Sequence, residues 1–147
     1  MKKCRQFLSA VLVVSIVLVT VINVAAIDTT RRASDYLSRY LAYVYPDGNG
    51  TVSVWFEVQG VQTMDEVGVL TIRLQEKAPT ASNWSPAKTF THTEYTDMLE
   101  ENNSFHWGHV SYAGTAGYSY RAYVTVWAGK NGNGDSRIIL TDAVVAK

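Results

Sequence analysis

The chain of 147 residues contains a single cysteine, Cys4, so no intramolecular disulfide can form. This excludes the disulfide-stapled scaffolds that many small secreted domains use to compensate for a thin core. Charged residues make up only 18% of the chain, whereas 47% are hydrophobic and 12% are aromatic. Such a composition excludes an intrinsically disordered chain and is sufficient to fill the core of one domain.

Cations are scarce once the N-terminus is set aside. The chain has 13 Lys and Arg against 13 Asp and Glu, but Lys2, Lys3 and Arg5 belong to a predicted targeting segment. Without these three cations the net charge is about −3. A mildly acidic domain lacks the basic patch that is typical of proteins that bind nucleic acid or an anionic membrane surface. We therefore expect neither as a partner.

Residues 1–26 have the pattern of a secretory signal peptide. A basic start precedes an uncharged apolar run from Phe7 to Val24, and two small residues follow it. We predict a signal helix that is cleaved before Ile27, which leaves a secreted domain without cysteine. The alternative is an uncleaved anchor with the domain facing outside, because the run is just long enough to span a bilayer. Export without disulfides is more typical of Gram-positive bacteria than of eukaryotes.

After a polar lead over residues 27–35, the pattern of residues 36–147 is that of β-strands. In the segment 51–59, Val52, Val54, Phe56 and Val58 share one face. The turn signal at 46–50 predicts a hairpin between this strand and residues 36–45. A second hairpin turn is expected at 129–134, and a single helical turn at 94–103, where Asp97 and Glu100 have capping-box spacing.

Further strands are expected at 67–76, with Leu70, Ile72 and Leu74 inward, and at 88–92, 105–112, 118–128 and 137–145. Seven short strands separated by turns predict an all-β fold, an antiparallel seven-stranded β-sandwich in one domain.

The segment Gly-Thr-Ala-Gly-Tyr-Ser-Tyr-Arg-Ala-Tyr-Val-Thr-Val at 114–126 resembles the sixth strand of fibronectin type III and immunoglobulin-like domains. The resemblance includes their tyrosine corner, with Tyr120 at the corner position and Tyr118 as the alternative. The chain also resembles small secreted proteins of Gram-positive bacteria that carry only a domain-of-unknown-function label. Segments 32–37, 64–68 and 122–129 carry that likeness. It implies secretion and a sandwich, and no catalytic residue.

Four groups of polar residues suggest metal or acid–base chemistry, and none fits it. His106 and His109 lie three apart on an expected strand, so they point to opposite faces, and His92 could join them only through a tertiary contact. The calcium-like spacing that begins at Asp47 has Val52 where the loop needs glycine, and the segment 130–135 is better explained as a turn. Adjacent carboxylates at Asp65 and Glu66, expected in a loop, form no cleft. We predict no metal, no cofactor and no catalytic residue.

More large aromatic side chains are expected on the outer faces of the strands than scattered exposure would give. If the valines point inward, Trp55, Tyr123 and Trp127 point outward, as do Tyr43 and Tyr45 if Tyr40 and Val44 face the core. Exposed rings can stack on sugars or anchor a protein partner. The preferred candidate site is Tyr123, Trp127 and Arg121, and the second patch is Trp55, Tyr43 and Tyr45, on a separate face.

The predicted function is therefore that of a secreted, non-enzymatic binding module for a glycan or a protein surface. Two alternatives remain open. One is a small extracellular hydrolase that uses the histidines, and the other is a matrix protein that associates with itself through sheet edges.

Overall fold

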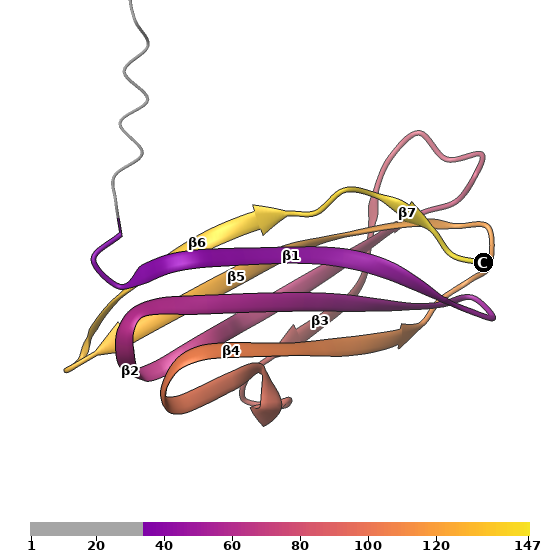
Figure 1. Cartoon of the computed structure of the whole chain (residues 1–147). Helices are drawn as coiled ribbons and strands as arrows, with labels where there is room; N and C mark the ends of the chain where they lie inside the picture. Colours follow the sequence, from indigo (N-terminus) through magenta and orange to yellow (C-terminus); the bar gives the residue numbers. More distant parts are fainter. Residues whose placement is uncertain (1–33) are drawn as a thin grey trace, which may run out of the picture. The chain divides into compact units, whose positions relative to one another are not determined.

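The computed structural model describes residues 34–147. The predicted signal helix, its cleavage site before Ile27 and nearly all of the polar lead lie outside these residues. Seven strands make up most of the described chain (Figure 1). They are β1 (Leu37–Gly48), β2 (Thr51–Lys77), β3 (Ser85–Thr91), β4 (Leu99–Ala113), β5 (Ser119–Lys130), β6 (Asn133–Leu140) and β7 (Val144–Val145). No helix within 34–147 is long and apolar enough to cross a bilayer.

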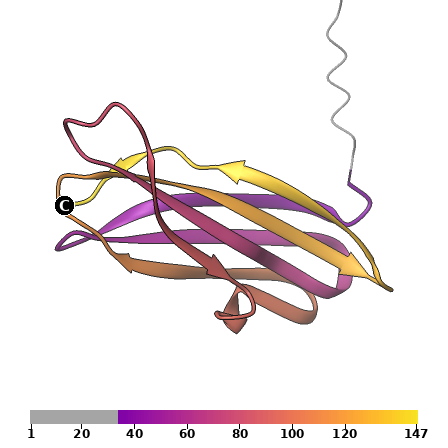
Figure 2. The same ribbon diagram turned by 180° about the vertical axis from the view of Figure 1, so that it is seen from behind.

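All strand pairs are antiparallel, and they form one hydrogen-bonded sheet that curls into a half-barrel (Figures 1 and 2). The prediction of an all-β, antiparallel, seven-stranded fold is thus confirmed. The strands are not uniformly short, because β2 has 27 residues and β4 has 15. The first part of β2 pairs with β1 and β4, and its last part pairs with β3 and β5.

The continuity of β2 corrects the prediction of two strands joined by a loop at 64–66. The register of β2 against β4 shifts between Gln59 and Met64, so the strand changes direction without leaving the sheet. The Met64 side chain is fully buried and packs over Gly60, where a Cβ atom would lie 2.6 Å from Cγ of Met64. Asp65 and Glu66 are therefore strand residues with exposed side chains.

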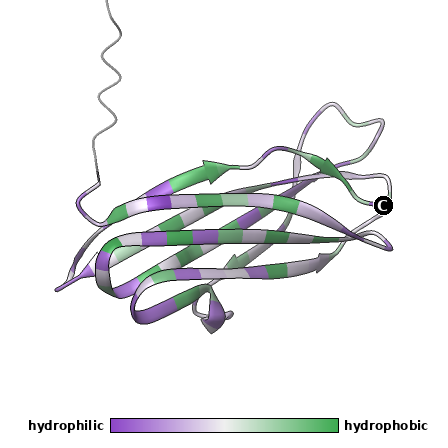
Figure 3. Cartoon of the chain, viewed as in Figure 1, coloured by the Kyte–Doolittle hydropathy of each residue, from purple (hydrophilic) through white to green (hydrophobic). Residues whose placement is uncertain are grey.

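The core lies on the concave face of the sheet. Buried and more exposed residues alternate most regularly along β5 and the first part of β2 (Figure 3). The predicted inward residues Val52, Val54, Phe56 and Val58 are all buried. Leu70 is not buried as predicted, because it lies at a shift in the register of β2 against β5. This irregularity changes the alternation, so that Val67 and Val69 are buried before it and Ile72 and Leu74 after it.

Both predicted hairpin turns are present. Between β5 and β6 the loop is Asn131-Gly132, and both residues have positive φ, which is the requirement of a type I′ turn. The expected helical turn at 94–103 is reduced to a 3-10 turn, η1 (Thr96–Met98). Its N-cap residue is Tyr95, whose side chain makes no capping hydrogen bond. The expected capping box does not form, because Asp97 lies inside the turn and Glu100 pairs with β2.

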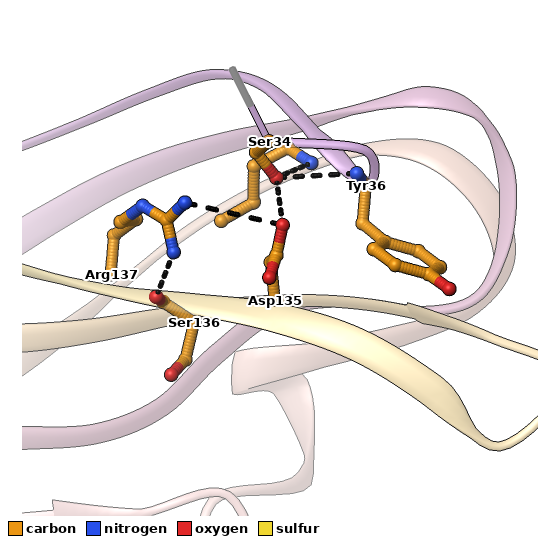
Figure 4. Close-up of polar contacts among 6 residues, drawn as sticks. Ser34, Tyr36, Asp135, Ser136 and Arg137 are labelled. Atoms are coloured by element: carbon orange, nitrogen blue, oxygen red, sulfur yellow. Dashed lines mark hydrogen bonds and ion pairs between the residues drawn. The ribbon is translucent and has the colours of Figure 1, made fainter. Parts of the chain in front are cut away.

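The segment just before β1 is joined to β6, at the other end of the sheet path, by a polar clasp (Figure 4). The Ser34 hydroxyl donates to Oδ2 of Asp135 at 2.6 Å and accepts the backbone N–H groups of Tyr36 and Leu37. Arg137 lies 4.0 Å from the same carboxylate oxygen. Because the clasp links residues at opposite ends of the path, it holds the curl of the sheet.

Candidate functional site

The convex side of β1, β2 and β4 carries a group of aromatic rings that we call the aromatic face: Tyr43, Trp55, Trp107 and His109. Register places them together, because Tyr43 and His109 lie directly opposite Trp55 on the two neighbouring strands. Trp107 is two residues from His109 along β4, and therefore shares its face. The rings thus form a continuous row across three strands.

The tryptophans of the aromatic face lie parallel. The ring centroids of Trp55 and Trp107 are 6.0 Å apart with an angle of 2° between the planes. Trp55 also stacks with the imidazole of His109, with the ring centroids 4.6 Å apart. Trp55 is half-buried between its neighbours, whereas Trp107 is 59% exposed and Tyr43 is 48% exposed. The inner ring is fixed by its neighbours while the outer rings offer surface to a ligand.

A shallow hollow of about 210 Å³ opens on this face, and Tyr43, Trp55, Glu57 and Trp107 are among its lining residues. Glu57 lies directly opposite Trp107 in the register. Its carboxylate is 3.3 Å from the guanidinium of Arg39. The hollow therefore combines flat apolar rings with a charged pair at its border.

Two of the three residues of the second predicted patch are direct neighbours in the structure. Trp55 and Tyr43 are cross-strand neighbours, and Tyr45 lies two residues further along β1, 54% exposed. Tyr40, which was expected to face the core, is 39% exposed, whereas Val44 is buried as expected. Sequence reasoning missed Trp107 and His109. Their alternation within the predicted strand 105–112 places them on one face, but only the pairing of β4 with β2 brings that face beside Trp55.

The residues of the preferred predicted site lie in two separate places, Arg121 and Tyr123 in one and Trp127 in the other. Arg121 and Tyr123 are neighbours, and the guanidinium of Arg121 lies 5.8 Å from the Tyr123 ring centroid and 4.3 Å from that of Trp84. Trp127 shares the convex side of β5 but makes different contacts. Its Nε1 donates to Glu66 at 3.2 Å, and its ring covers Gly129 and Gly134, where a Cβ atom would lie 2.7 Å and 2.5 Å from ring carbons.

A larger hollow of about 540 Å³ lies beside Trp127, and two of its three carboxylates, those of Asp65 and Glu66, are already engaged within the protein. Glu66 accepts from Trp127, and Asp65 accepts the backbone N–H of Asn131 at 2.7 Å. Lys130 donates to the carbonyl of Thr63 at 2.8 Å. The predicted carboxylate pair therefore ties the bend of β2 to the β5–β6 turn, which is a structural role.

The three histidines have three separate environments. His92 bonds the carbonyl of Leu70 through Nδ1 at 3.2 Å, and His106 bonds the carbonyl of Asp97 through Nε2 at 2.8 Å. His109 stacks on Trp55. His106 and His109 lie on opposite faces of β4, as predicted from their spacing. Within residues 34–147, no three His, Cys, Asp or Glu side chains converge as metal ligands would.

The tyrosine expected at the strand corner is Tyr120. Its side chain is fully buried, and its hydroxyl accepts the backbone N–H of Thr115 at 2.8 Å and donates to Oε2 of Glu76 at 3.1 Å. Burial raises the pKa of Tyr120, the Thr115 amide opposes that shift, and the Glu76 carboxylate reinforces it. The predicted corner residue and its backbone hydrogen bond are confirmed.

Comparison of the sequence with protein-family models and with curated proteins finds no match.

Proposed function

We propose that this protein is an exported, non-enzymatic binding module whose aromatic face binds a neutral carbohydrate chain. The observation that carries the proposal is the row of Tyr43, Trp55 and Trp107 across three strands, with its outer rings about half exposed. A soluble domain that leaves large parallel rings in water forgoes the free energy that their burial would contribute. A ligand that covers the rings provides this free energy of burial.

The geometry favours a sugar over a purely apolar ligand. Sugar rings present flat C–H surfaces that pack on indole and phenol rings, and their hydroxyl groups need hydrogen-bonding partners at the border. Glu57 can accept such bonds, and Arg39 can donate them. Glu57 lines the same hollow as the rings, and Arg39 is paired with it.

The test uses the four tryptophan indole N–H signals as reporters. In NMR titrations with cellohexaose or chitohexaose, we expect the signals of Trp55 and Trp107 to move and those of Trp84 and Trp127 to stay. Trp107→Ala and Tyr43→Ala should each weaken binding about tenfold, which corresponds to about 1.4 kcal/mol.

Tyr40→Ala is the matched control, because Tyr40 is the same residue type on the same strand with its side chain on the other face. It should bind like the wild type. If neither oligosaccharide moves any indole signal, or if the control loses affinity as much as the two test variants, the proposal is wrong.

The two alternatives have separate tests. A hydrolase built on the histidines requires at least two of them in one pocket, and their different partners argue against it. A self-associating matrix protein would use the unpaired edges of β1, β3, β4 and β6. Sedimentation at increasing protein concentration distinguishes it from a monomeric binder, because only the matrix protein gains mass.

We further propose that the curled sheet acts as the two layers of an immunoglobulin- or fibronectin-III-like sandwich. One layer would contain β1, β4 and the first part of β2, and the other β3, β5, β6 and the last part of β2. Support comes from the single core cluster that residues from both parts share and from the Tyr120 corner. The strand β2, which runs through both layers, departs from that pattern.

Export is part of the proposal and rests on the sequence of residues 1–26. N-terminal sequencing of the extracellular protein should begin at Ile27. A membrane-bound product that retains Met1 would instead indicate an anchored protein with the same domain outside.

A further inference from the structure

The convex side of β2 and β5 carries a second surface, which we call the cationic face: Arg73, Lys77 and Arg121, with the rings of Tyr123 and Trp84. Outward positions of β2 and β5 are opposite one another here, so Arg73 faces Tyr123 and Gln75 faces Arg121. Arg73 and Lys77 are four residues apart on β2, roughly 13 Å, and Arg121 lies level with the residue midway between them. The three cations therefore form a linear track.

Carboxylates are few around this track, and Asp142, which follows the Thr141–Ala122 backbone pair beside β5, forms no salt bridge with its cations. In the segments 67–93 and 119–134 the only Asp or Glu is Glu76, which points to the other face and accepts from the Tyr120 hydroxyl. The salt bridges found within residues 34–147 involve Arg39, His106 and Arg137, none of which belongs to the cationic face. In a domain that is acidic as a whole, three cations have collected on one surface without carboxylate partners.

The cations are held in place by neutral neighbours. Arg121 donates through Nε to Oε1 of Gln75 at 2.9 Å and lies over the Trp84 ring, with Lys77 5.2 Å from the same ring centroid. The guanidinium of Arg73 lies 5.3 Å from the centroid of the Tyr123 ring, and that of Arg121 lies 5.8 Å from the same centroid. These contacts reduce the entropy that the long side chains would lose on binding, and they leave the Nη groups of Arg121 free to donate.

We propose that the cationic face binds a linear anionic polysaccharide. Guanidinium groups pair with carboxylate or phosphate oxygens in a bidentate manner, and a row of three cations matches a ligand whose negative charges recur along its length. Hydroxyl and amide side chains beside the track, among them Thr71, Thr125 and Gln75, can bond the sugar hydroxyls.

A polysaccharide fits this surface better than an acidic peptide does. Over residues 71–76, β2 is paired on both sides, with β3 and with β5, so its backbone N–H and C=O groups are already used. An extended peptide gains much of its affinity from backbone pairing at an open edge, and the cationic face offers none. A ligand recognised entirely by its substituents does not need that edge.

The experiment compares three soluble polymers by isothermal titration of the domain at low and at physiological ionic strength. They are a polygalacturonate oligomer, an uncharged dextran of similar length and poly-L-glutamate. We expect binding of polygalacturonate that weakens with salt and no binding of dextran. Poly-L-glutamate should bind at least tenfold more weakly than polygalacturonate.

The double variant Arg73→Gln/Arg121→Gln should reduce the affinity for polygalacturonate at least tenfold. Lys130→Gln/Lys147→Gln removes the same charge away from both the cationic and the aromatic face and should reduce it less than twofold. Equal losses in the two double variants, or no binding of polygalacturonate, would overturn the proposal. Equal or tighter binding of poly-L-glutamate would assign the face to an acidic protein chain instead. The cationic face does not share residues with the aromatic face, so either proposal can fail alone.

Discussion

Replacing Tyr120 with phenylalanine removes a single hydroxyl from the most enclosed aromatic side chain of the domain. The ring itself still fills its place, so no cavity larger than the hydroxyl is left. What is lost is one accepted bond from the Thr115 amide at 2.8 Å and one donated bond to Glu76 at 3.1 Å. The variant therefore isolates the contribution of the hydroxyl from that of the packing.

The size of the effect follows from what happens to the two former partners. A buried donor that loses its acceptor costs about 1–3 kcal/mol. Thr115 is an exposed residue and Glu76 is only half-buried, so water can partly replace the hydroxyl at both. We therefore expect Tyr120→Phe to lower the free energy of unfolding by about 1–2 kcal/mol, which is roughly 4–10 °C in Tm for a domain of this size.

Urea unfolding followed by circular dichroism measures this difference, and Tyr118→Phe is the control. Tyr118 is the alternative corner residue, and no side-chain hydrogen bond involves it within the described chain. It should change the free energy of unfolding by less than about 0.5 kcal/mol. If Tyr120→Phe unfolds at the wild-type midpoint while Tyr118→Phe does not, the corner has been assigned to the wrong tyrosine.

Unfolding at alkaline pH provides a second comparison, between the wild type and Tyr120→Phe. The raised pKa of Tyr120 means that the folded protein keeps this proton at a pH where the unfolded chain releases it. The stabilisation is therefore complete below the ordinary tyrosine pKa of about 10 and is lost as the pH rises through the folded value. The wild type should lose more stability than Tyr120→Phe above about pH 10, and equal losses would refute the assigned cause.

Four further substitutions test the packing described above. Gly114→Ala should cost about 1–3 kcal/mol in thermal unfolding, since its Cβ would lie 2.5 Å from the Tyr120 hydroxyl and 3.0 Å from the Gly50 carbonyl; wild-type stability would mean that the corner can move. Ser34→Ala should cost about 1 kcal/mol and speed amide exchange at Leu37, because the clasp to Asp135 is lost; unchanged exchange would show that the clasp is not needed. Trp127→Ala should destabilise by about 1–3 kcal/mol and Trp107→Ala by less than about 1 kcal/mol, because only the former ring covers backbone; the reverse order would exchange their roles.

Much of the fold was predictable because it depends on local properties of the chain. Alternation in 51–59 and 118–128 assigns each side chain to the buried or the exposed face, and this assignment needs no knowledge of the partner strand. Asn131-Gly132 favours a tight hairpin through its own backbone angles. The Tyr120 corner spans only the few residues between Thr115 and itself.

The candidate sites depended on pairings between distant residues. Trp55 and Trp107 lie 52 positions apart in the numbering, and no local pattern fixes the register that makes them parallel neighbours. Trp84, from a loop with no periodicity, covers Arg121 only because β3 and β5 flank the same strand. The reach of Trp127 to Glu66, rather than to Tyr123, likewise depends on where β2 bends.

The sequence by itself determined which residues avoid water and where the chain turns, because hydrophobic alternation and positive φ are properties of single segments. Only the tertiary structure decided that β2 passes unbroken through both parts of the sheet, that Leu70 lies at an irregularity and that the exposed rings and cations occupy two different faces. These features follow from strand register, which is set by the packing of all strands around one core and not by any strand alone.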